Sequence, residues 1–195
     1  MSKIKKFFES ELMANSTKTQ KIAYVAVMTA LLVVCNMFFE FKLADTQFSL
    51  TIFFSALCGM VIGPIYGFIS CFLGDLVGFL YNSGGFMYMP WIGLSMGIIA
   101  FIAGIVMNCI DIKNKFATYI KIAIVCLSTF LLCTVAINTT AFWIIYNTRK
   151  VPFFAYLVTR LFVQGQIFNS VLNYALLFIC YPVMLRIKNS ITNRK

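Results

Sequence analysis

The sequence predicts an all-α membrane protein: a single bundle of six transmembrane helices with both chain termini in the cytoplasm. Of the 195 residues, 61% are hydrophobic and only 11% are charged, whereas a soluble domain has about 25% charged residues. The length allows roughly five to seven crossings of about 20 apolar residues each. It leaves no room for a soluble catalytic domain.

The first three spans are expected before residue 82. The first apolar run, at 22–39, follows a basic segment without a small-residue cleavage site, so we expect a cytoplasmic tail and not a cleaved signal peptide. The second run, at 48–62, is short for a full crossing. The third, at 64–81, begins with Pro64, whose missing N–H costs nothing at the start of a helix.

The last three spans follow a loop at 82–89 that is rich in glycine and aromatic residues. The fourth span is expected at 90–108, the fifth at 119–146 and the sixth at 153–185, and the last two are long enough to tilt. The chain therefore divides into three parts: an N-terminal tail at 1–21, a six-helix membrane domain at 22–185 and a C-terminal tail at 186–195.

The basic residues predict the orientation. Twelve of the 16 lie in the two tails or near the loop at 109–118, with Lys121 among them. Lys42, Arg149 and Lys150 lie on the opposite face. Because positive charge gathers on cytoplasmic segments, we expect both termini in the cytoplasm. The same distribution assigns the net charge of +10 to membrane topology and excludes nucleic acid as a partner.

Residues for metal binding and catalysis are missing from the sequence. It has seven cysteines, all in or beside apolar runs, without a CxxC pair and without histidine. Zinc sites depend on such cysteine and histidine spacings, so we expect neither a metal nor another cofactor. There is also no Walker A motif and no Ser/His/Asp set, and we expect no enzymatic activity.

Asp75 and Arg160 lie inside expected spans, where an ionisable residue is a functional-site hypothesis. Gln164 follows Arg160 by four residues and shares its helix face, and the planar guanidinium can bind a carboxylate through two hydrogen bonds. Two other interpretations stay open. Arg160 can reach the outer headgroups or pair with Asp75, and Asp75 can be a purely structural acid.

Further candidates lie in the outer halves of the helices and in the loop at 82–89. Asn138 is either a pocket wall or a bond between helices, and Trp143 lies at the same level. Tyr88 and Trp91 are either interfacial aromatics or parts of a lid that stacks on a flat ligand. Two residues of the last run, Asn169 and Asn173, face away from Arg160, and we expect them to bond to neighbouring helices.

Two segments resemble the substrate-binding S components of energy-coupling factor (ECF) vitamin transporters. The segment FSLTIFFSALCGMVIGPIYGFISCFLGDLVGFL resembles the G-x-x-x-GP-x-x-G…D region of that family, with its acid at Asp75. The segment NTTAFWIIYNTRKVPFFAYLVTRLFVQGQI resembles the folate-type branch. The chain length, the six expected helices and the basic cytoplasmic ends are also similar to that family.

The resemblance implies a multi-pass protein of a prokaryotic cell membrane that captures a folate-like vitamin from outside. It implies a pocket in the outer halves of the later helices, where the candidates named above lie. Ala26 and Ala30 on the first helix would dock on a transmembrane T subunit that carries two ATPases.

Alternatives remain because the loop NSGGFMYMPW differs from the proline-containing version of the folate branch. The cargo can instead be pantothenate, a B6 vitamer or a nucleobase-like compound. A protein of another class, a structural or assembly membrane protein, also fits the composition.

Overall fold

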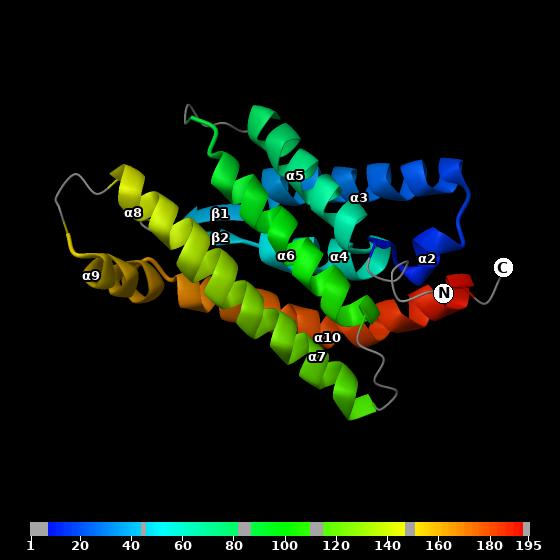
Figure 1. Cartoon of the computed structure of the whole chain (residues 1–195). Helices are drawn as coiled ribbons and strands as arrows, with labels where there is room; N and C mark the ends of the chain where they lie inside the picture. The colour runs from blue at the N-terminus through cyan, green and yellow to red at the C-terminus, as the bar shows by residue number, and fades with distance from the viewer. Residues whose placement is uncertain (1–7, 44–45, 82–86, 110–114, 147–150, 193–195) are drawn as a thin grey trace.

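The computed structural model describes residues 8–43, 46–81, 87–109, 115–146 and 151–192. They form a helical bundle with a two-stranded hairpin (Figure 1). In chain order the elements are α2 (Glu11–Ala14), α3 (Lys18–Phe38), β1 (Glu40–Leu43), β2 (Thr46–Ser49), α4 (Thr51–Ile62), α5 (Pro64–Tyr81), α6 (Pro90–Cys109), α7 (Lys115–Thr129), η1 (Phe130–Thr139), α8 (Thr140–Tyr146), α9 (Phe153–Val158), η2 (Thr159–Val163) and α10 (Gln166–Thr192), where η denotes a π-helical segment. Residues 82–86 of the expected lid loop, most of the loop at 109–118, and Arg149 and Lys150 lie outside the described residues.

Four helices in the described part of the chain are long and apolar enough to cross a membrane: α3, α5, α6 and the continuous helix Thr118–Tyr146. A fifth crossing results if α9–η2 and α10 form one span, which is bent by 54°. By contrast, α4 has 12 residues, fewer than the roughly 20 that a straight crossing needs. The expected helical membrane bundle is confirmed, with four or five candidate spans in these residues.

The bend between η2 and α10 occurs at Gly165. This residue has φ +66°, a left-handed conformation that glycine adopts without steric cost. The expected sixth span therefore consists of two segments with different directions, and Arg160 lies on the first of them.

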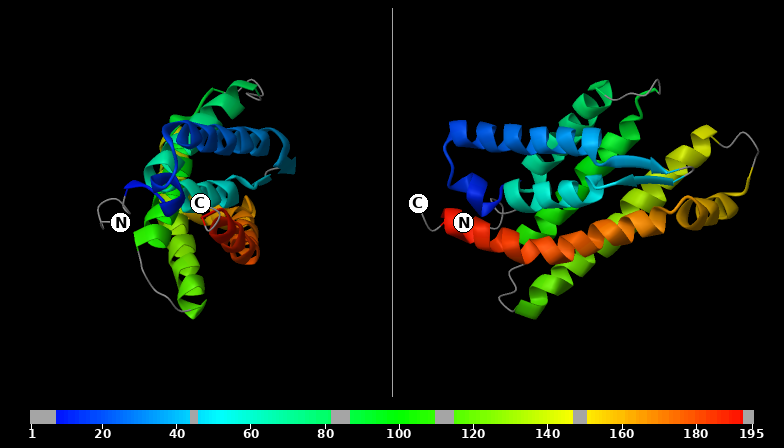
Figure 2. Two further views of the ribbon diagram at one scale, coloured as in Figure 1. Left: turned by 90° about the vertical axis from the view of Figure 1, so that its right-hand side faces the viewer. Right: turned by 180° about the vertical axis from the view of Figure 1, so that it is seen from behind.

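The expected second span differs from the structure at its start. Residues 46–49 pair with residues 40–43 as antiparallel strands, with Glu40 opposite Ser49, and α4 begins at Thr51. Thr46 and Phe48 suit this strand because β-branched and aromatic residues favour a pleated surface. The hairpin projects from one end of the bundle (Figure 2).

Two asparagines of α10 fasten this hairpin and α4. Asn173 is fully buried; its Oδ1 accepts the Phe53 N–H at 2.9 Å, and its Nδ2 donates to the Ser49 carbonyl at 2.8 Å. Asn169 Oδ1 accepts the Ser49 N–H at 3.1 Å. Since α4 has no side-chain cap of its own, α10 supplies a partner for its first turn. The predicted bond to a neighbouring helix is found for Asn173, whereas the described partners of the Asn169 side chain are Ser49 of the hairpin and Asn173 of its own helix.

Glycines allow α4, α5 and α6 to approach closely. A Cβ atom at Gly67 would lie 2.8 Å from the Cα of Gly59, and one at Gly104 would lie 2.6 Å from the backbone nitrogen of Pro64. Gly63, with φ +96°, turns the chain between α4 and α5, as the Gly-Pro pair predicts. The three helices thus form a closely packed centre.

Part of the segment expected as an N-terminal tail packs against this centre. Met13 on α2 is fully buried. Glu9 accepts hydrogen bonds from Lys21 Nζ at 2.8 and 2.9 Å and from the Tyr66 hydroxyl at 3.2 Å. Residues 9–14 therefore belong to the folded bundle.

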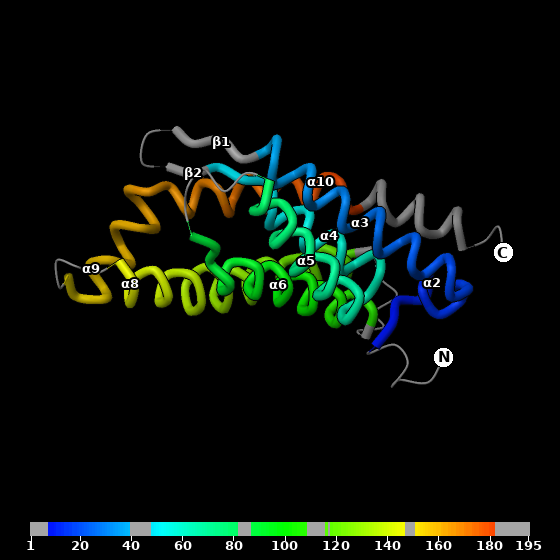
Figure 3. The backbone as a smooth tube through the Cα atoms, turned by 90° about the horizontal axis from the view of Figure 1, so that it is seen from above, coloured from blue at the N-terminus to red at the C-terminus, as the bar shows by residue number. Residues whose placement is uncertain are grey.

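The bundle has two distinct ends. The short helix α2 and the C-terminal end of α10 lie at one end, whereas the hairpin, α8 and α9 lie at the other (Figure 3). The start of α6 also points toward the second end. The candidate residues of α6, η1 and η2 can therefore meet there.

Candidate functional site

Arg160 is buried, with 7% of its surface exposed. Its Cζ lies 4.1 Å from the centroid of the Phe142 ring on α8, and its Nη1 donates to the backbone carbonyl of Asn138 at 3.4 Å. A guanidinium over an aromatic face is stabilised by about 2 kcal/mol or more where water is excluded. These contacts favour the inward-facing interpretation of Arg160 over a side chain that reaches the headgroups.

Phe142 connects Arg160 to Trp91 at the start of α6. The Trp91 and Phe142 rings meet edge to face with centroids 6.2 Å apart. We refer to Trp91, Asn138, Phe142 and Arg160 as the Phe142 cluster. Its members come from α6, η1, α8 and η2, so three of the seven candidate residues meet at one place.

Three polar atoms of the Phe142 cluster are buried without a hydrogen-bond partner in the described part of the chain: Nε1 of Trp91, Oδ1 of Asn138 and Nε of Arg160. Such an atom costs about 1–3 kcal/mol, and folded proteins contain only a few per 100 residues. Two such donors belong to side chains that contact the Phe142 ring, and the acceptor belongs to the residue whose backbone binds Arg160, so the cluster is a candidate site for a polar partner.

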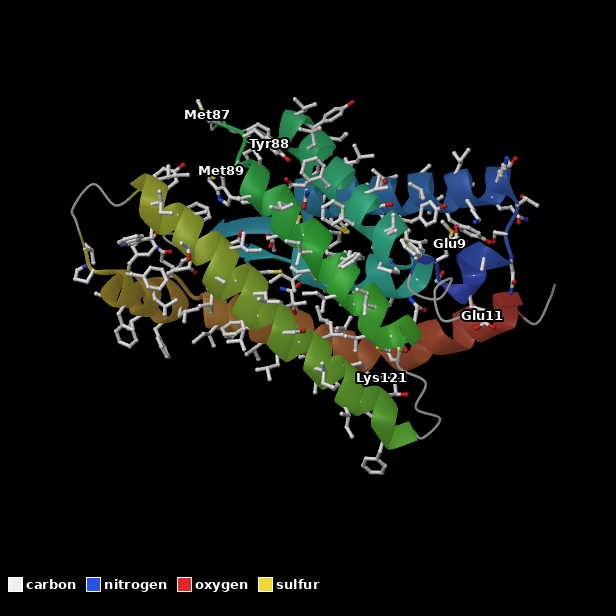
Figure 4. All side chains as sticks on the ribbon, viewed as in Figure 1. Glu9, Glu11, Met87, Tyr88, Met89 and Lys121 are labelled. Atoms are coloured by element: carbon white, nitrogen blue, oxygen red, sulfur yellow. The ribbon has the colours of Figure 1, made fainter. Side chains whose placement is uncertain are left out.

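Tyr146 extends the cluster toward the segment before α6. Its ring stacks on Phe142 with centroids 5.7 Å apart and an interplanar angle of 25°. Its hydroxyl contacts the Met89 sulfur at 4.0 Å, and its side chain is half exposed. Figure 4 shows Met89 with Met87 and Tyr88 in the segment that enters α6.

Trp143 has a different set of contacts from Phe142. Its Nε1 donates to the Val151 carbonyl at 2.9 Å, and its ring meets Phe153 edge to face at 5.6 Å. These contacts fasten α8 to the start of α9. By its described contacts, Trp143 lies beside the Phe142 cluster and holds α8 against the start of α9.

Gln164 ends η2, and its backbone N–H donates to the Thr159 carbonyl at 3.0 Å. The expectation that Gln164 shares a face with Arg160 assumed an α-helix. In the π-helical turn of η2 the backbone hydrogen bonds join residues five apart, and Gln164 follows this turn as its C-cap, so the shared face stays a prediction. No described contact joins the two side chains.

Asp75 is buried on α5, with 8% exposed, and its Oδ2 accepts the Tyr88 hydroxyl at 3.2 Å. Burial, and then the Asp75 carboxylate, raise the pKa of Tyr88 to about 12, so this hydroxyl remains a donor at neutral pH. The Tyr88 ring also contacts Phe79, with centroids 5.1 Å apart. The described contacts of Asp75 and Arg160 are thus with different partners.

Gly93 on α6 makes the contact between Asp75 and Tyr88 possible. A Cβ atom at this position would lie 2.8 Å from both the Asp75 Oδ2 and the Tyr88 hydroxyl oxygen. Sequence reasoning missed Gly93 and also Phe142. Phe142 follows Asn138 by four residues, so the shared helix face was a usable signal for it, but it is one of 21 phenylalanines.

Two other surfaces bear on function. Ala26 and Ala30 on α3 are exposed, as a docking face requires. A groove of about 360 Å³ lies between α5 and α6, lined by the apolar residues Ile65, Phe68, Ile69, Ile98 and Phe101. None of the candidate site residues lines this groove.

Comparisons with known proteins address the family and the fold. A family model described as "ECF-type riboflavin transporter, S component" matches residues 16–188. A solved structure, "Crystal structure of FolT bound with folic acid", is similar with a TM-score of 0.63 and 24% sequence identity, covering 82% of this chain and 91% of that chain. This likeness shows a shared fold. No curated protein matches the chain.

Proposed function

The chain belongs to the family of ECF-type riboflavin transporter S components, and from this membership we propose that it captures a folate-like vitamin outside the cell. It delivers this cargo to an ATP-driven module of a T subunit and two ATPases. The chain has a binding role and no catalytic one. It works as a multi-pass protein of a prokaryotic cell membrane.

The observation that carries the cargo proposal is the Phe142 cluster. A planar heteroaromatic ring has acceptors and donors along its edge. Such an edge can pair with the N–H of Trp91 and with the Asn138 oxygen, while the ring face stacks on the Arg160 guanidinium, whose N–H groups point outward in its own plane. An aliphatic cargo such as pantothenate has no ring for this stacking.

Folate carries such a ring in its pterin group, and FolT, which shares this fold, was solved with folic acid. Riboflavin is the second candidate because the family description names it, and its flat ring meets the same stacking requirement. A B6 vitamer or a nucleobase-like compound would use the cluster in the same way.

The proposed topology has six spans with both termini in the cytoplasm. In this arrangement α4, with the hairpin before it, makes the second crossing, and α9–η2 with α10 makes the sixth. The end with α2 faces the cytoplasm and the Phe142 cluster lies toward the outside. The excess of lysine and arginine in the two tails and near the loop at 109–118 supports this orientation, because cytoplasmic segments are rich in basic residues.

Thermal unfolding of the purified protein with folate, 5-formylfolate, riboflavin, pantothenate, pyridoxine, thiamine or biotin tests the proposal. We expect stabilisation by folate, since a ligand at 100 times its Kd adds about 2.7 kcal/mol. Stabilisation by riboflavin alone would make riboflavin the cargo. If no compound has an effect, the vitamin-capture proposal loses its support and the structural interpretation gains it.

Arg160→Ala tests the site. We expect a folded protein that has lost the folate effect and that unfolds at a somewhat lower temperature than the parent without ligand, because the contact with Phe142 is also lost. Arg160→Lys, which lacks the planar fork, should recover the folate effect only in part. Lys18→Ala, which removes a cation from an exposed position, is the matched control and should respond to folate normally. Unfolding of Arg160→Ala would instead indicate that Arg160 holds the bundle together.

A further inference from the structure

We infer that Phe142 is a gating residue: its ring occupies the position that a planar cargo ring takes, and it must turn away before cargo can bind. This inference rests on the proposed function and deepens it. It restricts the cargo to planar heteroaromatic compounds and assigns a role to a residue that the proposed function does not require.

Phe142 does not match its surroundings in polarity. A phenyl ring has no hydrogen-bonding atom, yet Phe142 lies against Trp91 and Arg160, whose Nε1 and Nε are unpaired in the described part of the chain. Arg160 also binds the backbone of Asn138, whose Oδ1 is unpaired as well. A purely structural phenylalanine would be expected among apolar side chains, or among polar side chains that are hydrogen-bonded to each other. The arrangement instead suits a ring of the same shape with polar atoms on its edge.

The Phe142 ring and a stacked cargo ring would also compete for the same space. Phe142 covers the guanidinium face of Arg160 at 4.1 Å and lies against Trp91 at 6.2 Å between centroids. A cargo ring that stacks on Arg160 and bonds to Trp91 therefore needs the space that Phe142 fills. Both cannot occupy it.

The Phe142 side chain is also held less firmly than that of its neighbour Trp143. Phe142 is only partly buried, and it stacks outward on Tyr146, which is 50% exposed. The next residue, Trp143, is instead fixed by its hydrogen bond to the Val151 carbonyl. The helix preceding α8 is π-helical, a geometry that occurs frequently at functional sites. Phe142 can therefore rotate while Trp143 keeps α8 in place.

The kinetics of cargo association test the gate. Trp91 is the neighbour of Phe142, so the intrinsic tryptophan fluorescence of the chain reports on the cluster, and Trp143 is kept because it fastens α8 to the start of α9. With this signal we measure stopped-flow association of folate and of riboflavin with the full chain in detergent. We expect Phe142→Ala to raise the association rate constant at least tenfold, because the competent state no longer has to form first. Slower association and weaker affinity in Phe142→Ala would make Phe142 a fixed wall of the pocket and would overturn the inference.

A second variant tests the gate without cargo. Phe142→Gln places an acceptor and a donor among the unpaired atoms, so we expect its unfolding midpoint within about 2 °C of the parent, a small change on the scale of about 4 °C per kcal/mol. Phe142→Leu, the apolar control, should unfold at a lower temperature because it loses the stacking on Arg160. A Gln variant that is less stable than the Leu variant would contradict the inference.

The outcomes for the two proposals can be told apart. If the parent binds neither folate nor riboflavin but Phe142→Gln keeps its stability, the proposed cargo is wrong. The inference that the cluster favours a polar group at position 142 is then still supported. If the parent binds cargo but Phe142→Ala associates more slowly, vitamin capture stands and the gate is wrong.

Discussion

Gly93 shows how a single missing side chain decides a local arrangement. Its position on α6 leaves room for the Tyr88 hydroxyl to donate to the buried Asp75 carboxylate. Tyr88 precedes α6 and Asp75 lies within α5, so this hydrogen bond ties the end of the loop to the helix before it. Any larger residue at position 93 would separate the two.

Gly93→Ala should therefore lower the free energy of unfolding by about 1–3 kcal/mol, the usual cost of overpacking a filled site. Thermal or denaturant unfolding of the purified protein measures the change. Leu94→Ala, at the adjacent and exposed position, is the control and should have a much smaller effect. Equal stability of the Gly93→Ala protein and the parent would show that Asp75 and Tyr88 have more room than the structure indicates.

At the scale of elements, α10 holds the end of β2 and the start of α4 in place. Asn173 reaches the first turn of α4 and the last residue of β2, about 120 residues earlier in the chain. Its two hydrogen bonds replace a local helix cap. The short helix α4 is thus held at its start by a distant element.

Asn173→Leu should leave the Phe53 N–H and the Ser49 carbonyl without partners, at roughly 1–3 kcal/mol for each. We expect a clear fall in the unfolding midpoint and faster amide hydrogen exchange at the start of α4. Leu172→Ala on the exposed side of the same helix controls for side-chain loss on α10. If the Leu variant kept the exchange protection of α4, the proposed capping by α10 would be wrong.

At the scale of the whole molecule, the exposed face of α3 and the Phe142 cluster lie on different elements. Ala26 and Ala30 are exposed, whereas the Phe142 cluster is formed by α6, η1, α8 and η2. Docking and cargo binding are therefore separable by mutation.

Ala26→Trp should abolish vitamin uptake by cells that also express the T subunit and ATPases, because a bulky ring prevents close helix contact. The thermal shift with cargo should stay unchanged. Leu31→Trp is the matched control, since it is exposed and lies about 140° away around the helix. Normal uptake by the Ala26→Trp protein would refute the docking role of this face.

Much of the helical framework was predictable from sequence. Pro64 and Pro90 begin α5 and α6 as expected, and membership of the S component family, expected from the Gly59–Asp75 region, is confirmed. The hairpin was missed because 40–47 was taken as the connection between the first two spans, although the polar and apolar residues of 40–43 alternate as they do in a strand. The bend at Gly165 was missed because a lone glycine inside an apolar run is usually tolerated in a helix.

The candidate site was only partly predictable. Arg160, Asn138 and Trp91 were singled out as polar or amphipathic residues at the right depth, and the structure brings them together. Phe142, on which they converge, has no polar atom to mark it. Trp143 was also singled out, and its described contacts join α8 to the start of α9. The place of Gln164 in the site stays a prediction.

The bend at Gly165 also divides two tasks between the segments that it joins. Residues 153–163 carry Arg160, whereas α10 beyond the bend carries the asparagines that fasten α4. Under the proposed function, a substitution of Arg160 should therefore change cargo binding and leave the hydrogen bonds at the start of α4 intact.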